Sequence, residues 1–295
     1  MRKSLLYIVL TISLGFGTQG ILLVADQVDG VQNPQFFNNY YTTALIDINN
    51  AYGVDYYYTV WDHALLGSPT FADLAPYKVV IWFFGNSCGF PASSPQYSHM
   101  CLTAAEETML QNWLLIAPGE RSLALFGMFT AWNTIADALN QQQYFDPLFS
   151  FDLALSYPDD NFDNWIQVND NWEVQGVAGD PITQGRIFDL DWASILNYPD
   201  QLEPRTDQGG HASGAWRDPQ GNLHHQAIIR SQGSKPGGGI YKTALFACPL
   251  ESYQEREDRR DLMYYLLHYW FGLPDGGSSP RVEPQSLGKI RTLYK

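Results

Sequence analysis

Continuous apolar runs alternate with helix-spaced apolar residues along the first half of the chain. Ile21–Ala25 is an unbroken apolar run that ends at Asp26, which is typical of a strand buried on both faces of a parallel sheet. Apolar residues then recur at helical spacing from Pro34 to Tyr52, and Gly53 ends this predicted helix. Further apolar runs predict strands at residues 54–61, 78–84 and 122–126.

Two more helices are predicted between and after these strands. Thr103 and Glu106 have the spacing of a capping box, and they open a predicted helix that runs to about Ile116. A second helix is expected at about residues 129–139. Repeated alternation of strand and helix favours a parallel sheet with helices on both faces, which is a three-layer α/β fold.

The second half of the chain has a different pattern. Residues 146–210 are irregular, with one predicted strand near Trp172–Val177. A β-hairpin is expected near the C-terminal part, with strands at 212–216 and 223–230 around a turn at 218–221. A further strand is predicted at 240–247 and a last helix at 255–271, with Gly272 as its C-cap. The predicted buried residues of that helix are Leu262, Met263, Leu266, Tyr269 and Trp270.

The two ends of the chain differ from the middle. Arg2 and Lys3 precede a 12-residue apolar run and then small residues, so residues 1–20 are predicted to be a secretory signal peptide. That run is shorter than the roughly 20 residues needed to cross a bilayer, so no transmembrane span is expected after cleavage. Residues 21–273 form the predicted domain, and 274–295 a flexible linker and basic tail, either a sorting signal or a disordered terminus. The product is expected to be secreted or located at the cell surface.

Charge excludes one class of partner. The chain has 17 Lys and Arg against 31 Asp and Glu, a formal net charge of −14, and a sequence pI of about 4.6. Nucleic-acid binding requires a basic surface that can neutralise phosphates. We therefore expect no nucleic-acid partner for this acidic chain.

Five segments, in this order, resemble a known family. They are Ile21–Asp26, Leu74–Trp82, Leu102–Glu106, Leu123–Gly127 and Tyr269–Gly272. Together they resemble the class I glutamine amidotransferase-like branch of flavodoxin-like α/β folds, over about residues 20–273, in the version found inside large secreted bacterial proteins. The resemblance implies a mostly parallel, three-layer flavodoxin-like sheet.

The same resemblance argues against the family's chemistry. In active members a cysteine nucleophile lies on a sharp turn just after the strand that corresponds to 122–127. Phe129 occupies that position here, and a phenyl ring cannot perform acyl transfer. No catalytic residue is therefore predicted, and the expectation leans away from an enzyme.

Residues that follow the predicted strands are the candidates for ligand binding. Asp26 and Gln27 follow the first strand, Asn86 and Ser87 the third, and Phe129 the fourth. The carboxyl ends of parallel strands share one edge, where open α/β folds bind ligands. We therefore expect these five residues to line a pocket, the alternative being that they only cap loops.

The three cysteines are interpreted in the light of the predicted export. Cys88, which follows the third strand, is expected to form a disulfide with Cys101 across a loop rich in Pro, Ser and Gly; the alternatives are that Cys88 is a nucleophile or that all three cysteines are reduced and unpaired. Cys248 lies in an apolar run and is expected to be a buried free thiol.

An acidic loop resembles part of a calcium site. Asp159, Asn161 and Asp163 alternate like the first ligands of a calcium loop, with Asp170 at the twelfth position. Asn164 stands where such loops need Gly, so a solvated acidic loop is the alternative and no cofactor is predicted.

These observations lead to one main hypothesis of function. The chain is expected to be an exported, non-catalytic α/β binding or accessory module for a protein or glycan at the cell surface. The first alternative is a hydrolase that uses Cys88 or a metal at the acidic loop, and the second is a structural spacer domain.

Overall fold

The computed structural model describes residues 19–26, 34–84, 102–127, 146–153, 172–191 and 200–274. The predicted signal peptide, the helix at 129–139, the acidic loop and the C-terminal tail lie wholly or almost wholly outside these residues. The described chain begins within the first strand, so the predicted signal-peptide boundary at residue 20 lies inside that strand.

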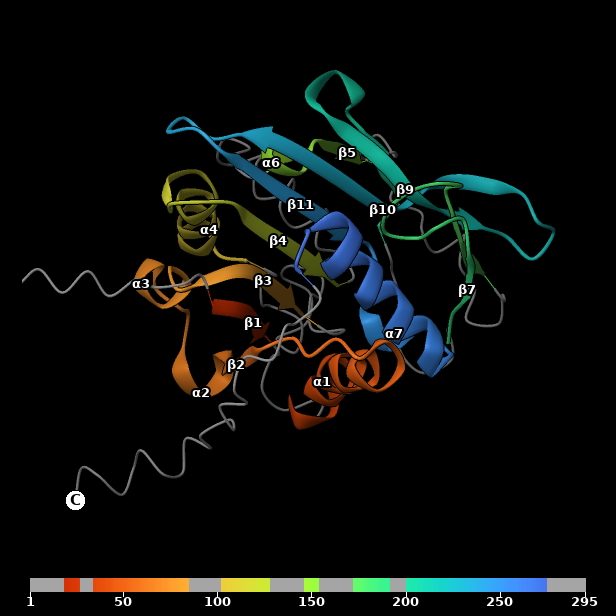
Figure 1. Cartoon of the computed structure of the whole chain (residues 1–295). Helices are drawn as coiled ribbons and strands as arrows, with labels where there is room; N and C mark the ends of the chain where they lie inside the picture. Colours follow the sequence, from red (N-terminus) through yellow and green to blue (C-terminus); the bar gives the residue numbers. More distant parts are fainter. Residues whose placement is uncertain are drawn as a thin grey trace, which may run out of the picture.

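One half of the central sheet is parallel (Figure 1). Its strands, in spatial order, are β2 (Tyr58–Asp62), β1 (Gln19–Ala25), β3 (Tyr77–Phe83), β4 (Arg121–Phe126) and β11 (Ile240–Phe246), and each pairs in parallel with its neighbours. Residues 21–25 and 79–83 are all buried, as their continuous apolar runs predicted. The parallel half therefore contains much of the core.

The other half of the sheet is antiparallel. It continues from β11 through β10 (Leu223–Ser234), β9 (Gly210–Arg217), β6 (Glu173–Gly176) and β7 (Ile187–Asp189), while β5 (Phe151–Leu153) pairs with β8 (Leu202–Pro204), which also pairs with β10. The α/β class and the β9–β10 hairpin are confirmed, but the 11-stranded sheet among the described residues is mixed rather than mostly parallel. Strands of three or four residues such as β5, β7 and β8 are too short to show a clear period in the sequence.

The helices and short helical turns connect these strands. They are α1 (Pro34–Tyr52), α2 (His63–Leu66), α3 (Phe71–Leu74), α4 (Ala104–Ile116), α6 (Asp146–Phe149), η3 (Thr206–Gln208), η4 (Leu250–Ser252) and α7 (Arg256–Tyr264), which continues as the π-helical η5 (Tyr265–Trp270). The Thr103–Glu106 capping box is confirmed, and Gly272 adopts the positive φ of a C-cap. Tyr269 is 52% exposed, so its predicted burial is wrong; the change from α to π turns rotates this residue off the buried face.

Among the described residues, none of the helices is both long enough and apolar enough to cross a lipid bilayer.

The side chains of β3 point alternately to the two faces of the parallel half of the sheet. Phe83 faces α1, where the Tyr41 ring stacks on it at a centroid distance of 3.8 Å, and Tyr41 also contacts Phe126 edge-on at 5.5 Å. The preceding residue, Trp82, points to the opposite face, because successive strand side chains alternate. Helices α1 and α7 lie side by side in Figure 1.

A buried polar cluster lies where β11 leads into η4. The Cys248 thiol donates to the Tyr253 hydroxyl at 3.4 Å, and the Leu250 backbone N–H donates to the Tyr41 hydroxyl at 3.2 Å. Cys248 is a free, buried thiol, as predicted, and burial raises its pKa to about 11. Glu251 is 2% exposed and belongs to the same cluster, where the Tyr41 hydroxyl acts on its carboxyl group. Burial raises the pKa of Glu251 to about 8.

Truncation of a β1 core residue tests the central position of that strand. Leu22 is fully buried, so we expect Leu22→Ala to lower the free energy of unfolding by about 2–5 kcal/mol through lost burial and a residual cavity. Leu65 is 78% exposed, so Leu65→Ala should change it by less than about 0.5 kcal/mol. Denaturant unfolding monitored by circular dichroism measures both, and equal effects would contradict the assignment of β1 to the core.

Glu251 should make stability depend on pH. Folding raises the pKa of Glu251 from 4.5 to about 8. The contribution of Glu251 to stability is therefore fully present below pH 4.5 and is lost as the pH rises to about 8. Glu251→Gln cannot ionise, so the variant should gain stability relative to wild type over that range, by an amount on the order of a few kcal/mol. Urea unfolding at several pH values measures the difference, and parallel pH profiles for the two proteins would refute the prediction.

Candidate functional site

Asp26 lies where the strand order of the parallel half reverses. The chain passes from β1 to β2 on one side of β1 and then returns to β3 on the other side. Asp26 follows β1 directly, and its backbone N–H donates to the Phe83 carbonyl at 3.0 Å. The carboxyl ends of the strands beside such a switch point are the usual ligand site of open α/β sheets.

Two other segments bring His63 and Glu106 to the same place. His63 follows β2 as the first residue of α2, whose N-terminus is capped by the Asp62 side chain. Glu106 is the third residue of α4, where the capping box with Thr103 fixes its carboxylate. His63 Nδ1 lies 3.1 Å from Asp26 Oδ1, and His63 Nε2 lies 2.8 Å from Glu106 Oε1. One ligand atom from each of the three residues falls within 4.8 Å of the others.

The Glu106 carboxylate accepts four hydrogen bonds. Its Oε2 accepts from the Thr103 backbone N–H and hydroxyl, both at 2.8 Å, and its Oε1 accepts from the Ser68 hydroxyl at 2.6 Å and from His63. Burial opposes ionisation here, but the hydrogen bonds outweigh it and lower the pKa of Glu106 to about 2. An ionised carboxylate can only accept, so the hydrogen between Glu106 and His63 belongs to Nε2.

Asp26 is fixed on its other side by Trp82. The indole Nε1–H of Trp82 donates to Asp26 Oδ2 at 3.0 Å, which leaves Oδ1 facing His63 Nδ1. Burial raises the pKa of Asp26 to about 6, although His63 and Trp82 act in the opposite direction. The hydrogen bond to Glu106 raises the pKa of His63, against the effect of burial. Asp26 Oδ1 and His63 Nδ1 thus face each other at 3.1 Å, and their charges influence each other.

Ser68 makes this site resemble a nucleophile–base–acid triad. Its exposed hydroxyl lies 3.2 Å from His63 Nε2, and Asp26 lies on the other ring nitrogen. In a working triad, Nε2 must present a lone pair to the serine. Here Nε2 carries the hydrogen that Glu106 accepts, and the Ser68 hydroxyl also donates to Glu106. The arrangement orients His63 but leaves Ser68 without a base among the described residues.

Of the predicted ligand-binding residues, Asp26 lies at the expected edge of the sheet. Gln27, Asn86, Ser87 and Phe129 lie outside the described residues, as do Cys88 and Cys101 and the calcium candidates Asp159, Asn161, Asp163 and Asp170.

The sequence interpretation missed His63 and Glu106 as site residues. His63 comes shortly after the predicted strand at 54–61, so the rule that selected Asp26 could have found it. In the sequence, Glu106 shows only the pattern of a helix-capping residue. Its spacing from Thr103 already accounts for it as part of a capping box, so nothing indicated a further role.

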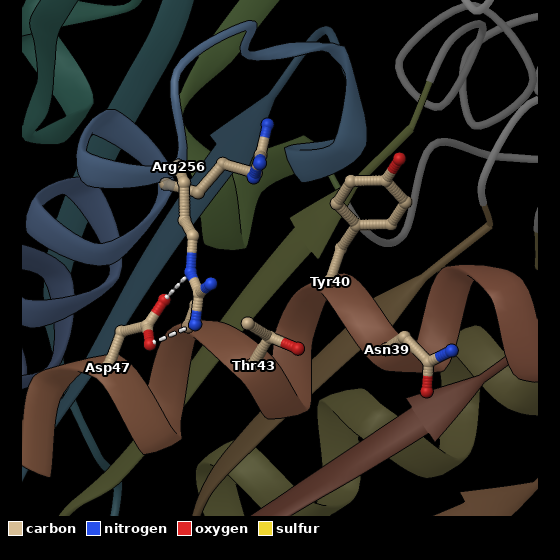
Figure 2. Close-up of a pocket in the computed structure, with 7 residues that line it drawn as sticks. Asn39, Tyr40, Thr43, Asp47 and Arg256 are labelled. Carbon is tan, nitrogen blue, oxygen red and sulfur yellow. Dashed lines mark hydrogen bonds and ion pairs between the residues drawn. The ribbon is translucent and has the colours of Figure 1, made fainter. Parts of the chain in front are cut away.

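Figure 2 shows a separate pocket of about 270 Å³ between α1 and the start of α7. Two of its charged groups bind each other. Arg256 forms two hydrogen bonds with the Asp47 carboxylate, at 2.5 and 2.6 Å (Figure 2). Arg259 donates to the Tyr253 and Gln254 carbonyls. All three charged side chains that line this pocket therefore have partners.

Comparison with known proteins leaves the family open. No family model matches the chain, and no curated protein matches it. A solved structure of Agd3, described as a novel carbohydrate deacetylase, is similar at 10% identity and a TM-score of 0.44, covering 78% of this chain; the chain spans 29% of the length of Agd3. The mmIFT52 N-terminal domain is similar at 15% identity and a TM-score of 0.47, covering 88% of this chain and 100% of that domain. At these values neither similarity assigns a family or a function.

Proposed function

We propose that this chain is an exported, non-catalytic α/β binding module whose ligand site is the sheet edge around Asp26 and His63. Its partner is a protein or glycan at the cell surface. The exposure of the two side chains supports this site, since Asp26 is 16% and His63 24% accessible. Glu106, at 4%, is buried beneath them and positions the imidazole.

The arrangement of the parallel strands supports the amidotransferase-like scaffold. The spatial order β2-β1-β3-β4-β11 corresponds to the order 2-1-3-4-5 of flavodoxin-like folds. The antiparallel half would then be an addition to that scaffold at β11. A shared scaffold does not bring shared chemistry, so the proposed function depends on the site.

The 2.8 Å contact between His63 Nε2 and the Glu106 carboxylate is the observation that carries the non-catalytic proposal, because it assigns a hydrogen to Nε2. Because Glu106 accepts this hydrogen, Asp26 Oδ1 and His63 Nδ1 are the groups that remain for a ligand. A carboxylate beside an imidazole suits a group that donates hydrogen bonds or carries positive charge.

A hydrolase is the second candidate, because Ser68 lies within 3.2 Å of His63 Nε2. A movement of Glu106 away from His63 would be enough to free Nε2 as a base. As long as Glu106 holds the hydrogen on Nε2, Ser68 should be unreactive.

Ligand binding should depend on Asp26. Wild type, Asp26→Asn and the control Asp47→Asn are applied to an array of glycans and cell-surface peptides. We expect Asp26→Asn to weaken binding at least about tenfold, a loss of about 1.4 kcal/mol, because it removes the charge of the carboxylate that a ligand would contact. Asp47 belongs to the pocket of Figure 2, so its variant should bind normally. Binding that is lost in Asp47→Asn and kept in Asp26→Asn would move the ligand site to that pocket.

Ser68 should resist a reagent specific for activated serines. A fluorophosphonate probe is incubated with the folded protein, and labelled peptides are identified by mass spectrometry. We expect no adduct on Ser68, because His63 Nε2 has no lone pair to accept its proton. An adduct on Ser68 that disappears in His63→Gln would contradict the non-catalytic proposal and favour the hydrolase.

A further inference from the structure

Asp26 Oδ1 and His63 Nδ1 have the separation of two ligands on one metal ion. Zinc binds imidazole nitrogen and carboxylate oxygen at about 2.0–2.2 Å, so two ligands at a tetrahedral angle lie about 3.4 Å apart. The observed separation is 3.1 Å. A shift of a few tenths of an ångström would therefore admit the ion.

The groups around this pair already orient both ligand atoms. Metal-binding histidines commonly donate their other ring N–H to a carboxylate, which fixes the tautomer and the direction of the ring. Glu106 accepts from Nε2 in this way and is itself held by Thr103 and Ser68. Trp82 binds the remaining oxygen of Asp26. Each ligand thus has its second polar atom occupied and its first atom within 3.1 Å of the other ligand.

We propose that Asp26 Oδ1 and His63 Nδ1 bind a divalent transition-metal ion of the zinc type, with Glu106 as the residue that positions His63. This inference rests on the proposed function, and it adds that a metal ion binds at the same site. The cluster comes from three segments, after β1, at the start of α2 and at the start of α4, so it is a product of the fold.

The ligand atoms favour zinc over calcium or magnesium. Calcium takes six to eight oxygen ligands, and magnesium prefers octahedral oxygen. This site offers one imidazole nitrogen and one carboxylate, because the Glu106 oxygens are taken by four donors. Imidazole suits zinc and the neighbouring transition metals.

The two protein ligands found among the described residues leave open positions on the ion. Catalytic zinc sites also keep an open position, but use three protein ligands. At this site, oxygen atoms of a bound glycan or peptide could fill the open positions. The metal would thereby contribute directly to the binding function.

The test is zinc binding to the purified protein after treatment with EDTA and removal of the chelator. Isothermal titration calorimetry with zinc chloride, and separately with calcium chloride, is run on wild type, Asp26→Asn and His63→Gln. His211→Gln is the matched control, because His211 is exposed and lies far along the chain on β9. Circular dichroism establishes that each variant is folded, and the two site variants give independent tests should one of them unfold.

We expect one zinc ion per chain, no comparable calcium binding, and at least tenfold weaker zinc binding in both site variants. His211→Gln should match wild type. Absence of zinc binding, or zinc binding unchanged in both folded site variants, would overturn the proposal. The glycan and peptide array repeated in EDTA separates the two proposals: binding that persists in EDTA and still depends on Asp26 would retain the ligand site and remove the metal.

Discussion

The Glu106 carboxylate, which accepts four hydrogen bonds, determines how the side chains at the sheet edge beside Asp26 are oriented and protonated. Four donors keep it ionised in a buried position, so it can only accept from His63. That single constraint assigns a hydrogen to Nε2, turns Nδ1 toward Asp26 and keeps His63 from acting as a base for Ser68. A charged group that is fully hydrogen-bonded can remain buried at low cost, whereas the same group without partners would be costly. Glu251 is the contrasting case, because burial outweighs the hydrogen bonds that act on it and raises its pKa to about 8.

The sheet positions this cluster through its change of direction at β1. Helix α1 packs on the face that carries Phe83, and Tyr41 bridges from that helix to the rings of Phe83 and Phe126. Trp82 projects from the other face and reaches Asp26. Phe83 and Trp82, which are adjacent in β3, thus contact the core residue Tyr41 on one face and the site residue Asp26 on the other.

Much of the parallel half could be predicted from the sequence, because its strands are continuous apolar runs with clear helix signals between them. Thr103 and Glu106 located the start of α4 through a local rule. The mixed character of the sheet could not be predicted, since β5, β7 and β8 have only three residues each and depend on pairing with distant strands. The site was predicted in part, through Asp26. Its contacts with His63 and Glu106 arise from segments 37 and 80 residues further along the chain, and no local pattern encodes such contacts.

The protonation of the two His63 ring nitrogens in the metal-free protein is the most direct test of the role of Glu106. Long-range nitrogen–proton NMR correlation spectra distinguish a ring nitrogen that carries hydrogen from one that presents a lone pair, and His63→Gln assigns the signals. We expect Nε2 to carry hydrogen at every pH at which the protein is folded and Glu106 is ionised, whatever the state of Nδ1. A lone pair on Nε2 near neutral pH would contradict this role, because His63 would then be a base directed at Ser68.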